Sequence, residues 1–232
     1  MENVFLKYMR QRLGKDEKNT NEINEGPVIT ISREYGCHGK KIAEHLTEVL
    51  NKKLKHEGKE VQWRWLSKEI IEESARELKL TPTLIKNLSD YKNRSFFENL
   101  ALFFSDTYYP SDAKINNTIA NFIHTAASQG NVVIVGRAAE AITKNFTKSF
   151  HVKLIAPLDW RAEIISASEG IPLSEAKREC IDMDRRRFMF RSYFEKGAPD
   201  VEFYDASFNC KEMTDDEIVE LIIIIAETRG FI

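Results

Sequence analysis

A single stretch near the start of the chain, residues 27–46 (PVITISREYGCHGKKIAEHL), constrains the fold more than any other. Its β-branched residues at 28–31 predict a buried strand, Gly36 and Gly39 mark a short loop, and an amphipathic helix is expected from Lys40 onward. The unpaired N–H groups of such a loop and of the first helical turn point to one place, where the helix dipole adds positive potential. The stretch therefore predicts a site for an anion, and the phosphate tail of a nucleotide is the expected ligand.

The loop departs from the strict phosphate-binding pattern GxxxxGK[ST]. In an ungapped alignment Arg33 takes the place of the first glycine, and Gly39 takes the place of the lysine. Lys40 then comes one position late, and Lys41 replaces the magnesium-binding hydroxyl. Taken alone, the loop is also compatible with an ordinary β–α turn that carries surface lysines.

Composition narrows the class of protein. With 232 residues, 42% of them hydrophobic, the chain can bury the core of one domain with insertions. Its net charge of −2 argues against a general nucleic-acid binder, which would be broadly basic. Charged residues interrupt any secretory signal in residues 1–13, and the apolar run 218–226 is too short to cross a membrane. We therefore expect neither a nucleic-acid nor a membrane partner.

The three cysteines, Cys37, Cys180 and Cys210, are odd in number and lie far apart in the sequence. They have no metal-ligand spacing, and no protein metal site is expected. Reduced thiols in a cytoplasmic protein are the simplest interpretation.

Residues 1–26 are predicted to form an appendage ahead of a domain at 27–232. Apolar residues at helical spacing in the first thirteen positions indicate a short amphipathic helix, followed by a polar linker. Such a helix must bury its apolar stripe on its own domain or on a second subunit. A homodimer through this helix is therefore one of two open alternatives.

From Gly26 onward the pattern alternates between strands and helices. Strands are predicted at 28–32, 61–66, 131–135, 150–155 and 203–208. Helices are predicted at 40–55, 67–78, 137–146, 157–168 and 173–194, with further helical segments between 82 and 129 and a last helix capped by Thr214. This order predicts an α/β fold with a five-stranded parallel sheet, helices on both faces, and ligands at the carboxyl ends of the strands.

Two further features carry positive charge to that edge of the sheet. Arg137, in Val135-Gly136-Arg137, follows the third strand and could grip a second phosphate, or it could simply cap the next helix. The run 182–191 contains two aspartates and four arginines; at helical spacing Asp184 can pair with Arg187, and Asp182 faces Arg185 and Arg186. This run is either a solvated helix face or a lid whose arginines close over a transferring phosphoryl group.

Taken together, ITISREYGCHGKKIAEHL, WLSKEIIEE, NVVIVGRAAEAI, IAPLDWR, the D-x-x-R-x-R run and YDASFN resemble the cytidylate kinase-like family of P-loop nucleoside monophosphate kinases. The similarity covers roughly residues 27–228. The SREYG-x-x-G loop is its most specific part, because the family itself has this altered phosphate loop. The resemblance implies the P-loop fold with its five-stranded parallel sheet, a helical acceptor-binding region at 67–128 and an arginine lid at 173–200.

The resemblance also implies a reaction, the transfer of the γ-phosphoryl group of ATP, with Mg²⁺, to a nucleoside monophosphate, with a cytidylate-type acceptor favoured. The implied ATP- and phosphate-binding residues are Ser32, Arg33, Gly36, Cys37, His38, Gly39, Lys40 and Lys41. Lys40 or Lys41 would supply charge to the β- and γ-phosphates. The implied catalytic residues are Lys40, Arg185 and Arg187, and the implied acceptor contacts are Arg137, Arg161 and Asp182. Arg94, beside an aromatic cluster, is a further candidate acceptor contact.

The chain also departs from the family pattern. Val135 replaces the aspartate that precedes Gly-Arg in cytidylate kinases, and Ser67 stands where the family usually has an aspartate. These changes leave the acceptor base open. Two other functions are also compatible with these changes. One is a nucleotide-binding sensor that has lost catalysis, and the other is a kinase for another small acceptor.

Overall fold

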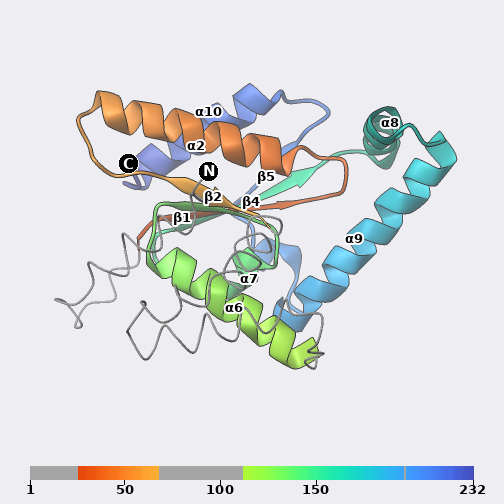
Figure 1. The fold of residues 1–232 in the computed structure, drawn as a ribbon, viewed down its shortest axis with the longest axis horizontal. Coiled ribbons are helices and arrows are strands. Elements are labelled where there is room, and N and C mark those ends of the chain that lie inside the picture. Colours follow the sequence, from red (N-terminus) through yellow and green to blue (C-terminus); the bar gives the residue numbers. More distant parts are fainter. Residues whose placement is uncertain (1–25, 68–111, 196) are drawn as a thin grey trace, which may run out of the picture.

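The computed structural model describes residues 26–67, 112–195 and 197–232, in which a five-stranded sheet is flanked by helices (Figure 1). The strands are β1 (Val28–Arg33), β2 (Arg64–Leu66), β3 (Val132–Val135), β4 (Ser149–Ile155) and β5 (Ala206–Asn209). Their order is β2-β3-β1-β4-β5, and every neighbouring pair is parallel. The predicted fold class is confirmed.

The strand order places the end of β1 where ligands bind in sheets of this kind. The chain leaves β1 for the far strand β2, returns through β3, and then crosses to β4 on the other side of β1. The carboxyl end of β1 therefore lies at a topological switch point. Both faces of the central strands are covered, and Ile29, Ile31 and Val133 are fully buried, which explains the continuous apolar runs in the sequence.

Helices cover both faces of the sheet. In Figure 1, α2 (Gly39–His56) and α10 (Asp215–Thr228) lie on one face, and α6 (Asp112–Ser128) and α7 (Ala139–Ile142) lie on the other. The apolar stripe of α2, with Ile42, Leu46 and Leu50, recurs every four residues and is buried against the sheet. Beyond the carboxyl edge, α8 (Leu158–Glu169) packs against the long helix α9 (Leu173–Glu195), which extends back toward α7 (Figure 1).

The predicted start of the last helix is confirmed in detail. The Thr214 hydroxyl accepts a hydrogen bond from the Glu217 backbone N–H at 3.2 Å, and the Glu217 carboxylate accepts one from the Thr214 N–H at 2.8 Å. This reciprocal pair is a capping box. It fixes the first turn of α10, including Asp215, beside the start of α2.

Three predicted elements differ from the structure. The helix predicted at 137–146 is only Ala139–Ile142, because Gly136, Arg137 and Ala138 all have left-handed φ angles of 72°, 60° and 54°. Since these conformations are incompatible with an α-helix, the helix begins only after them. The second strand is shorter than 61–66, and the last strand lies later than 203–208 because a 3₁₀ turn, Asp200–Glu202, precedes it.

The predicted appendage at 1–26 and the helices between 68 and 111 lie outside the described residues, as does Arg94. Across the part of the chain that is described, no helix is both long and apolar enough to span a membrane.

The buried imidazole of His151 predicts a pH-dependent stability. His151 lies on β4, where its Nδ1 is 2.8 Å from the Thr30 hydroxyl oxygen on β1. Burial lowers the pKa of His151, with Asp205 opposing and Arg229 adding to the shift. The folded state therefore keeps this ring neutral at a pH where the unfolded chain binds a proton. We expect the free energy of unfolding to be highest above a pH of about 6.5. Below that pH it should fall by up to about 1.4 kcal/mol per pH unit, because the unfolded chain binds a proton that the folded chain does not.

Urea unfolding between pH 7.5 and 5.5 tests this expectation. His151→Asn keeps a polar partner for Thr30 but does not titrate, so its free energy of unfolding should fall less steeply than that of the wild type. His56→Asn, at an exposed position near the end of α2, is the matched control. Equal slopes for wild type and His151→Asn would contradict the prediction.

Candidate active site

A glycine loop, residues 34–38, joins β1 to α2 and is fastened to the neighbouring strand β4. The Glu34 backbone N–H donates to the Leu154 carbonyl at 3.0 Å. The Glu34 carboxylate in turn accepts a hydrogen bond from the Ala156 N–H at 3.0 Å. The loop therefore begins in a fixed position above the carboxyl ends of β1 and β4.

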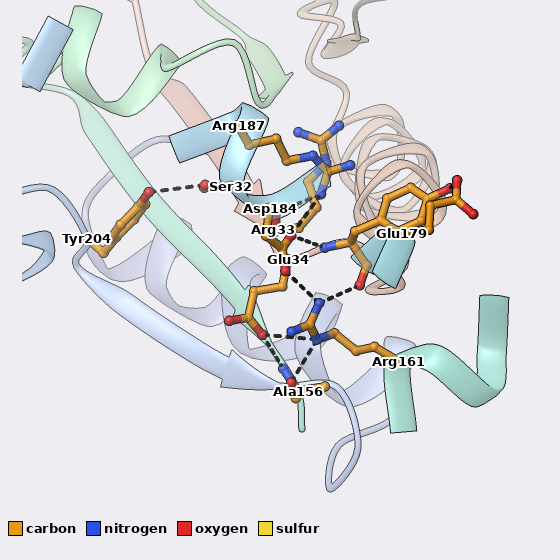
Figure 2. Close-up of polar contacts among 10 residues, drawn as sticks. Ser32, Arg33, Glu34, Ala156, Arg161, Glu179, Asp184, Arg187 and Tyr204 are labelled. Atoms are coloured by element: carbon orange, nitrogen blue, oxygen red, sulfur yellow. Dashed lines mark hydrogen bonds and ion pairs between the residues drawn. The ribbon is translucent and has the colours of Figure 1, made fainter. Parts of the chain in front are cut away.

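Arg161, on α8, is buried and holds this loop from the side (Figure 2). Its guanidinium donates from Nε to the Ala156 carbonyl and from Nη1 to the Tyr35 carbonyl, both at 2.9 Å. Nη1 also lies 2.7 Å from the Asp184 carboxylate, and Nε lies 3.4 Å from that of Glu34. With 6% of the residue exposed, this arginine joins the loop to the protein interior. Its predicted role as an acceptor contact stays a prediction.

Asp184 connects the long helix α9 to the same loop. Its carboxylate accepts a hydrogen bond from the Tyr35 backbone N–H at 2.7 Å. The Tyr35 hydroxyl lies 3.0 Å from Glu169 and 3.2 Å from Glu179, so the ring spans from α8 to α9. Burial, followed by the contact with Glu169, raises the pKa of Tyr35. The tyrosine is neutral and acts as a hydrogen-bond donor.

Several loop amides have acceptors within the protein. Besides the Tyr35 N–H, the Cys37 N–H donates to the Glu34 carbonyl at 3.2 Å, and the Gly39 N–H donates to the Cys37 carbonyl at 2.9 Å. The sequence predicted that these amides point together at an external anion. In this structure side-chain and backbone oxygens of the loop and of α9 accept the hydrogen bonds of these three groups, and their predicted convergence on an anion stays a prediction.

The side chain of Arg33 lies across the start of α2. A methyl group at Gly39 would lie 3.1 Å from Cδ and 3.2 Å from Cγ of Arg33. At Gly136, just after β3, a methyl group would overlap Nη1 of the same side chain. Both positions are glycines, so the arginine passes from the end of β1 over the helix N-terminus to the end of β3.

The arginines predicted to form a lid are placed differently from one another. Arg187 donates from Nη1 to the Arg33 carbonyl at 2.9 Å, and its guanidinium lies 5.3 Å from the centre of the Tyr35 ring (Figure 2). Burial lowers the pKa of Arg187, and Asp184, 4.0 Å away, opposes that shift. Arg185 is 72% exposed and lies 3.8 Å from Asp182, which is also exposed. The predicted pairs Asp184–Arg187 and Asp182–Arg185 are both present.

The two lysines at the start of α2 are exposed. The Lys41 side chain is 73% exposed, and its ammonium lies 2.9 Å from the Asp215 carboxylate of α10. The hydrogen bond with Asp215 raises the pKa of Lys41. His38 Nδ1 is 3.4 Å from the same carboxylate. Lys40 lies at the second position of α2 and is also exposed.

The remaining predicted residues flank the loop. Arg137, with a left-handed φ of 60°, places its guanidinium 5.5 Å from the centre of the Phe190 ring on α9. Cys37 packs against the core, where a hydrogen bond with Cys210, followed by burial, raises the pKa of its thiol. Gly36 has a φ of 94°, and a methyl group there would lie 2.9 Å from Cβ of Arg161.

One polar network beside the loop was not predicted. The Tyr204 hydroxyl lies 3.1 Å from both the Ser32 hydroxyl and the Glu140 carboxylate, and Arg191 Nη1 donates to it at 2.6 Å. Glu140 is 1% exposed, and burial raises its pKa. Because a tyrosine has one hydroxyl proton, it donates to either Glu140 or Ser32 at a given moment. The network holds the end of β1 against α7 and α9. Its only signal in the sequence was a charged residue, Glu140, within the apolar stretch 138–142.

No group of three or more histidine, cysteine, aspartate or glutamate side chains that could hold a metal ion occurs within residues 26–67, 112–195 and 197–232.

A family comparison matches residues 28–212 to the cytidylate kinase-like family. The chain belongs to the cytidylate kinase-like family. The matched region starts at β1 and includes the glycine loop, α8, α9 and β5, so all the side chains placed around the loop above fall within it except Asp215.

The fold of this cytidylate kinase-like chain is similar to that of a solved structure. An uncharacterised protein from Eubacterium ventriosum is 21% identical, with a TM-score of 0.61 over 87% of this chain and 98% of that one. Shikimate kinase from Acinetobacter baumannii (13% identity, TM-score 0.46, 89% and 96% covered) and a gluconokinase from Sinorhizobium meliloti (13%, 0.45, 90% and 97%) are more distant. Only the first likeness is strong enough to support the fold, and at its identity it supports nothing further.

One curated relative matches over a shorter stretch. Uronate isomerase from Corynebacterium glutamicum is 30% identical over 99 residues, which is 42% of this chain. The chain spans only 19% of the length of that isomerase. The match therefore assigns no isomerase activity.

The buried position of Arg161 predicts a large effect on stability. Arg161→Ala removes donors from two carbonyl groups and leaves the Asp184 carboxylate without its nearest cation. Breaking such a buried ion pair costs about 3 kcal/mol in free energy of unfolding. Arg185→Ala, at an exposed ion pair on α9, should cost less than about 1 kcal/mol. Urea unfolding of both variants checks this, and similar losses would show that Arg161 does not hold the loop.

Proposed function

We propose that this protein transfers the γ-phosphoryl group of ATP to a nucleoside monophosphate. The observation that carries the proposal is the gathering of Arg33, Arg137 and Arg187 around the carboxyl ends of β1 and β3 in a chain of the cytidylate kinase-like family. Phosphoryl transfer requires in-line positioning and positive charge on the phosphate oxygens rather than covalent chemistry from the protein. Three guanidinium groups at a topological switch point meet that requirement.

In this proposal each arginine has a separate task. Arg137, after β3, would hold the acceptor phosphate, and the glycine loop with the start of α2 would hold the donor. Arg187 is the lid arginine closest to the loop, because it already contacts the Arg33 carbonyl. Arg185 faces solvent and would need a movement of α9 to reach a substrate. Asp182 and Arg161 remain weaker candidates for acceptor contact, the first because it is exposed and the second because it is buried.

ATP would bring Mg²⁺, which neutralises charge on its phosphate oxygens. Lys40 and Lys41, the two residues after Gly39, carry no P-loop hydroxyl, and Val135 stands in place of the acid before Gly-Arg. We therefore expect phosphate oxygens and water to supply most of the ion's ligands. A cytidylate-type acceptor is favoured by the family alone, and a homodimer through residues 1–26 remains a proposal.

A second function, a nucleotide-binding sensor without turnover, is favoured by one observation. The Tyr35 N–H, which a P-loop enzyme would offer to phosphate, donates to Asp184. A loop already held by a carboxylate can fix α9 without any substrate. A kinase for another small acceptor would use the same donor site.

Two measurements separate these functions. Isothermal titration with a non-hydrolysable ATP analogue reports donor binding, and a coupled assay of ADP release reports turnover with each nucleoside monophosphate. Turnover with cytidylate supports the proposed kinase, and binding without turnover for any acceptor supports the sensor. Turnover only with non-nucleotide acceptors would favour the third function.

The position of Arg187 predicts a selective loss of catalysis. One arginine that neutralises transition-state charge is worth about 10³-fold or more in turnover. Arg187→Ala should therefore lower kcat by that order while changing the dissociation constant of the ATP analogue less than about tenfold. Arg186→Ala, at the adjacent exposed arginine, is the matched control. Equal losses in kcat and in binding would reject the role of Arg187 as a lid arginine.

A further inference from the structure

The cation and the glycine of the phosphate loop stand in exchanged positions in this chain. The strict pattern begins with a glycine at the position of Arg33 and has its lysine at the position of Gly39. Here the arginine comes first and the glycine occupies the lysine's position. The two departures lie at opposite ends of the loop, six residues apart, but the structure brings them into contact.

That contact makes the exchange sterically coupled. The aliphatic part of Arg33 passes so close to Gly39 that a Cβ atom there would lie 3.1 Å from its Cδ. This is tighter than ordinary van der Waals contact, so a lysine at position 39 would compete with Arg33 for the same space. The arginine thus fills the space over the first residue of α2, where a P-loop lysine would start.

The charged end of Arg33 reaches the place where a phosphate is expected. Its Nη1 lies against Gly136, next to the end of β3, after the side chain has crossed the N-terminus of α2. A helix N-terminus and the adjoining strand ends are favoured sites for phosphate groups. Guanidinium donors also match phosphate oxygens better than an ammonium does, because they form two parallel hydrogen bonds.

The lysines of α2 are less well placed. Lys41 is exposed and paired with Asp215, on the side of the loop that faces α10. Lys40 follows Gly39 on an exposed part of α2. Other arginines lie around Arg33: Arg187 donates to its carbonyl, and Arg137 follows Gly136. The carboxylates of Asp184 and Glu34 lie within 4 Å of the Arg161 guanidinium. A phosphate at the end of β1 would therefore meet several guanidinium donors.

We propose that Arg33 takes the place of the P-loop lysine and is the cation that binds the donor phosphates of this protein. This inference rests on the proposed function, because it assigns a residue to its donor site. It also explains why the strict motif is absent from a chain that belongs to a kinase-like family.

Single substitutions give the first test. We expect Arg33→Ala to weaken binding of the ATP analogue about 100-fold, and Arg33→Lys to restore part of that loss. Lys40→Ala and Lys41→Ala should each weaken binding less than Arg33→Ala does. Far-UV circular dichroism and urea unfolding of each variant separate a loss of binding from a loss of fold.

The exchange itself gives a sharper test. Arg33→Gly combined with Gly39→Lys returns the cation and the glycine to their usual places. If a cation from either position 33 or position 39 can bind the donor phosphates, the double variant should bind the analogue at least tenfold more tightly than Arg33→Gly alone. A lysine at 39 that brings no recovery would overturn the inference.

Two glycines provide a matched pair that leaves Arg33 itself unchanged. Gly136 and Gly170 have nearly the same left-handed φ, 72° and 68°, so alanine causes similar backbone strain at both. Only at Gly136 would the new methyl group displace the Arg33 guanidinium, since nothing lies within 4 Å at Gly170. Gly136→Ala should therefore weaken analogue binding at least tenfold more than Gly170→Ala does, and equal effects would count against Arg33.

The outcomes distinguish this inference from the proposed function. Binding that depends on Arg33, without turnover on any acceptor, would reject the kinase and keep the assignment of Arg33. Turnover that survives Arg33→Ala but fails in Lys40→Ala would keep the kinase and overturn the assignment. A wild-type protein that does not bind the analogue would overturn both.

Discussion

The buried guanidinium of Arg161 is the interaction on which the candidate site depends. It joins the end of β4, the glycine loop and α9 through the Ala156 carbonyl, the Tyr35 carbonyl and the Asp184 carboxylate. Because an unpaired buried charge costs several kcal/mol, Arg161 and Asp184 are stable in this position only together. Their pairing brings Arg187, one helical turn after Asp184, to the loop. The same contact explains Gly36, since its position beside Cβ of Arg161 leaves no room for a side chain.

In the proposed donor site, arginines rather than loop amides supply the attraction for an anion. Three of those amides already donate to protein oxygens, that of Tyr35 to Asp184 on α9 and those of Cys37 and Gly39 to carbonyls of the loop, so a phosphate would have to displace these acceptors to reach them. The positive charge comes instead from arginines on three separate elements, the ends of β1 and β3 and the middle of α9. This differs from a strict phosphate loop, in which backbone amides and one lysine provide most of the attraction. Arginines can replace them because a guanidinium presents several donors in a fixed plane.

The sequence was sufficient for the features that depend on local patterns. Apolar runs at β1 and β3 located the centre of the sheet, Thr214 located the start of α10, and i,i+3 spacing located the Asp184–Arg187 pair. It was insufficient where residues far apart meet. The sequence did not predict the contacts of Arg161 with the carbonyls of Ala156 and Tyr35, which lie 5 and 126 positions away in the chain, and its role as an acceptor contact stays a prediction. The short α7 also escaped prediction, because left-handed φ angles at Arg137 and Ala138, which are not glycines, leave no mark in the sequence.

The contact between Asp184 and the Tyr35 N–H links the position of α9 to the occupancy of the loop. A phosphate that reached this N–H would have to displace the carboxylate, because one N–H group makes one strong hydrogen bond. The displaced carboxylate would still be neutralised by Arg161 and Arg187, whose donors face it independently. The Tyr35 hydroxyl would keep its contact with Glu179, so α9 would remain attached to the loop at a second point. The loop and α9 are therefore joined by two separate contacts, and only the one at the Tyr35 N–H would compete with a phosphate.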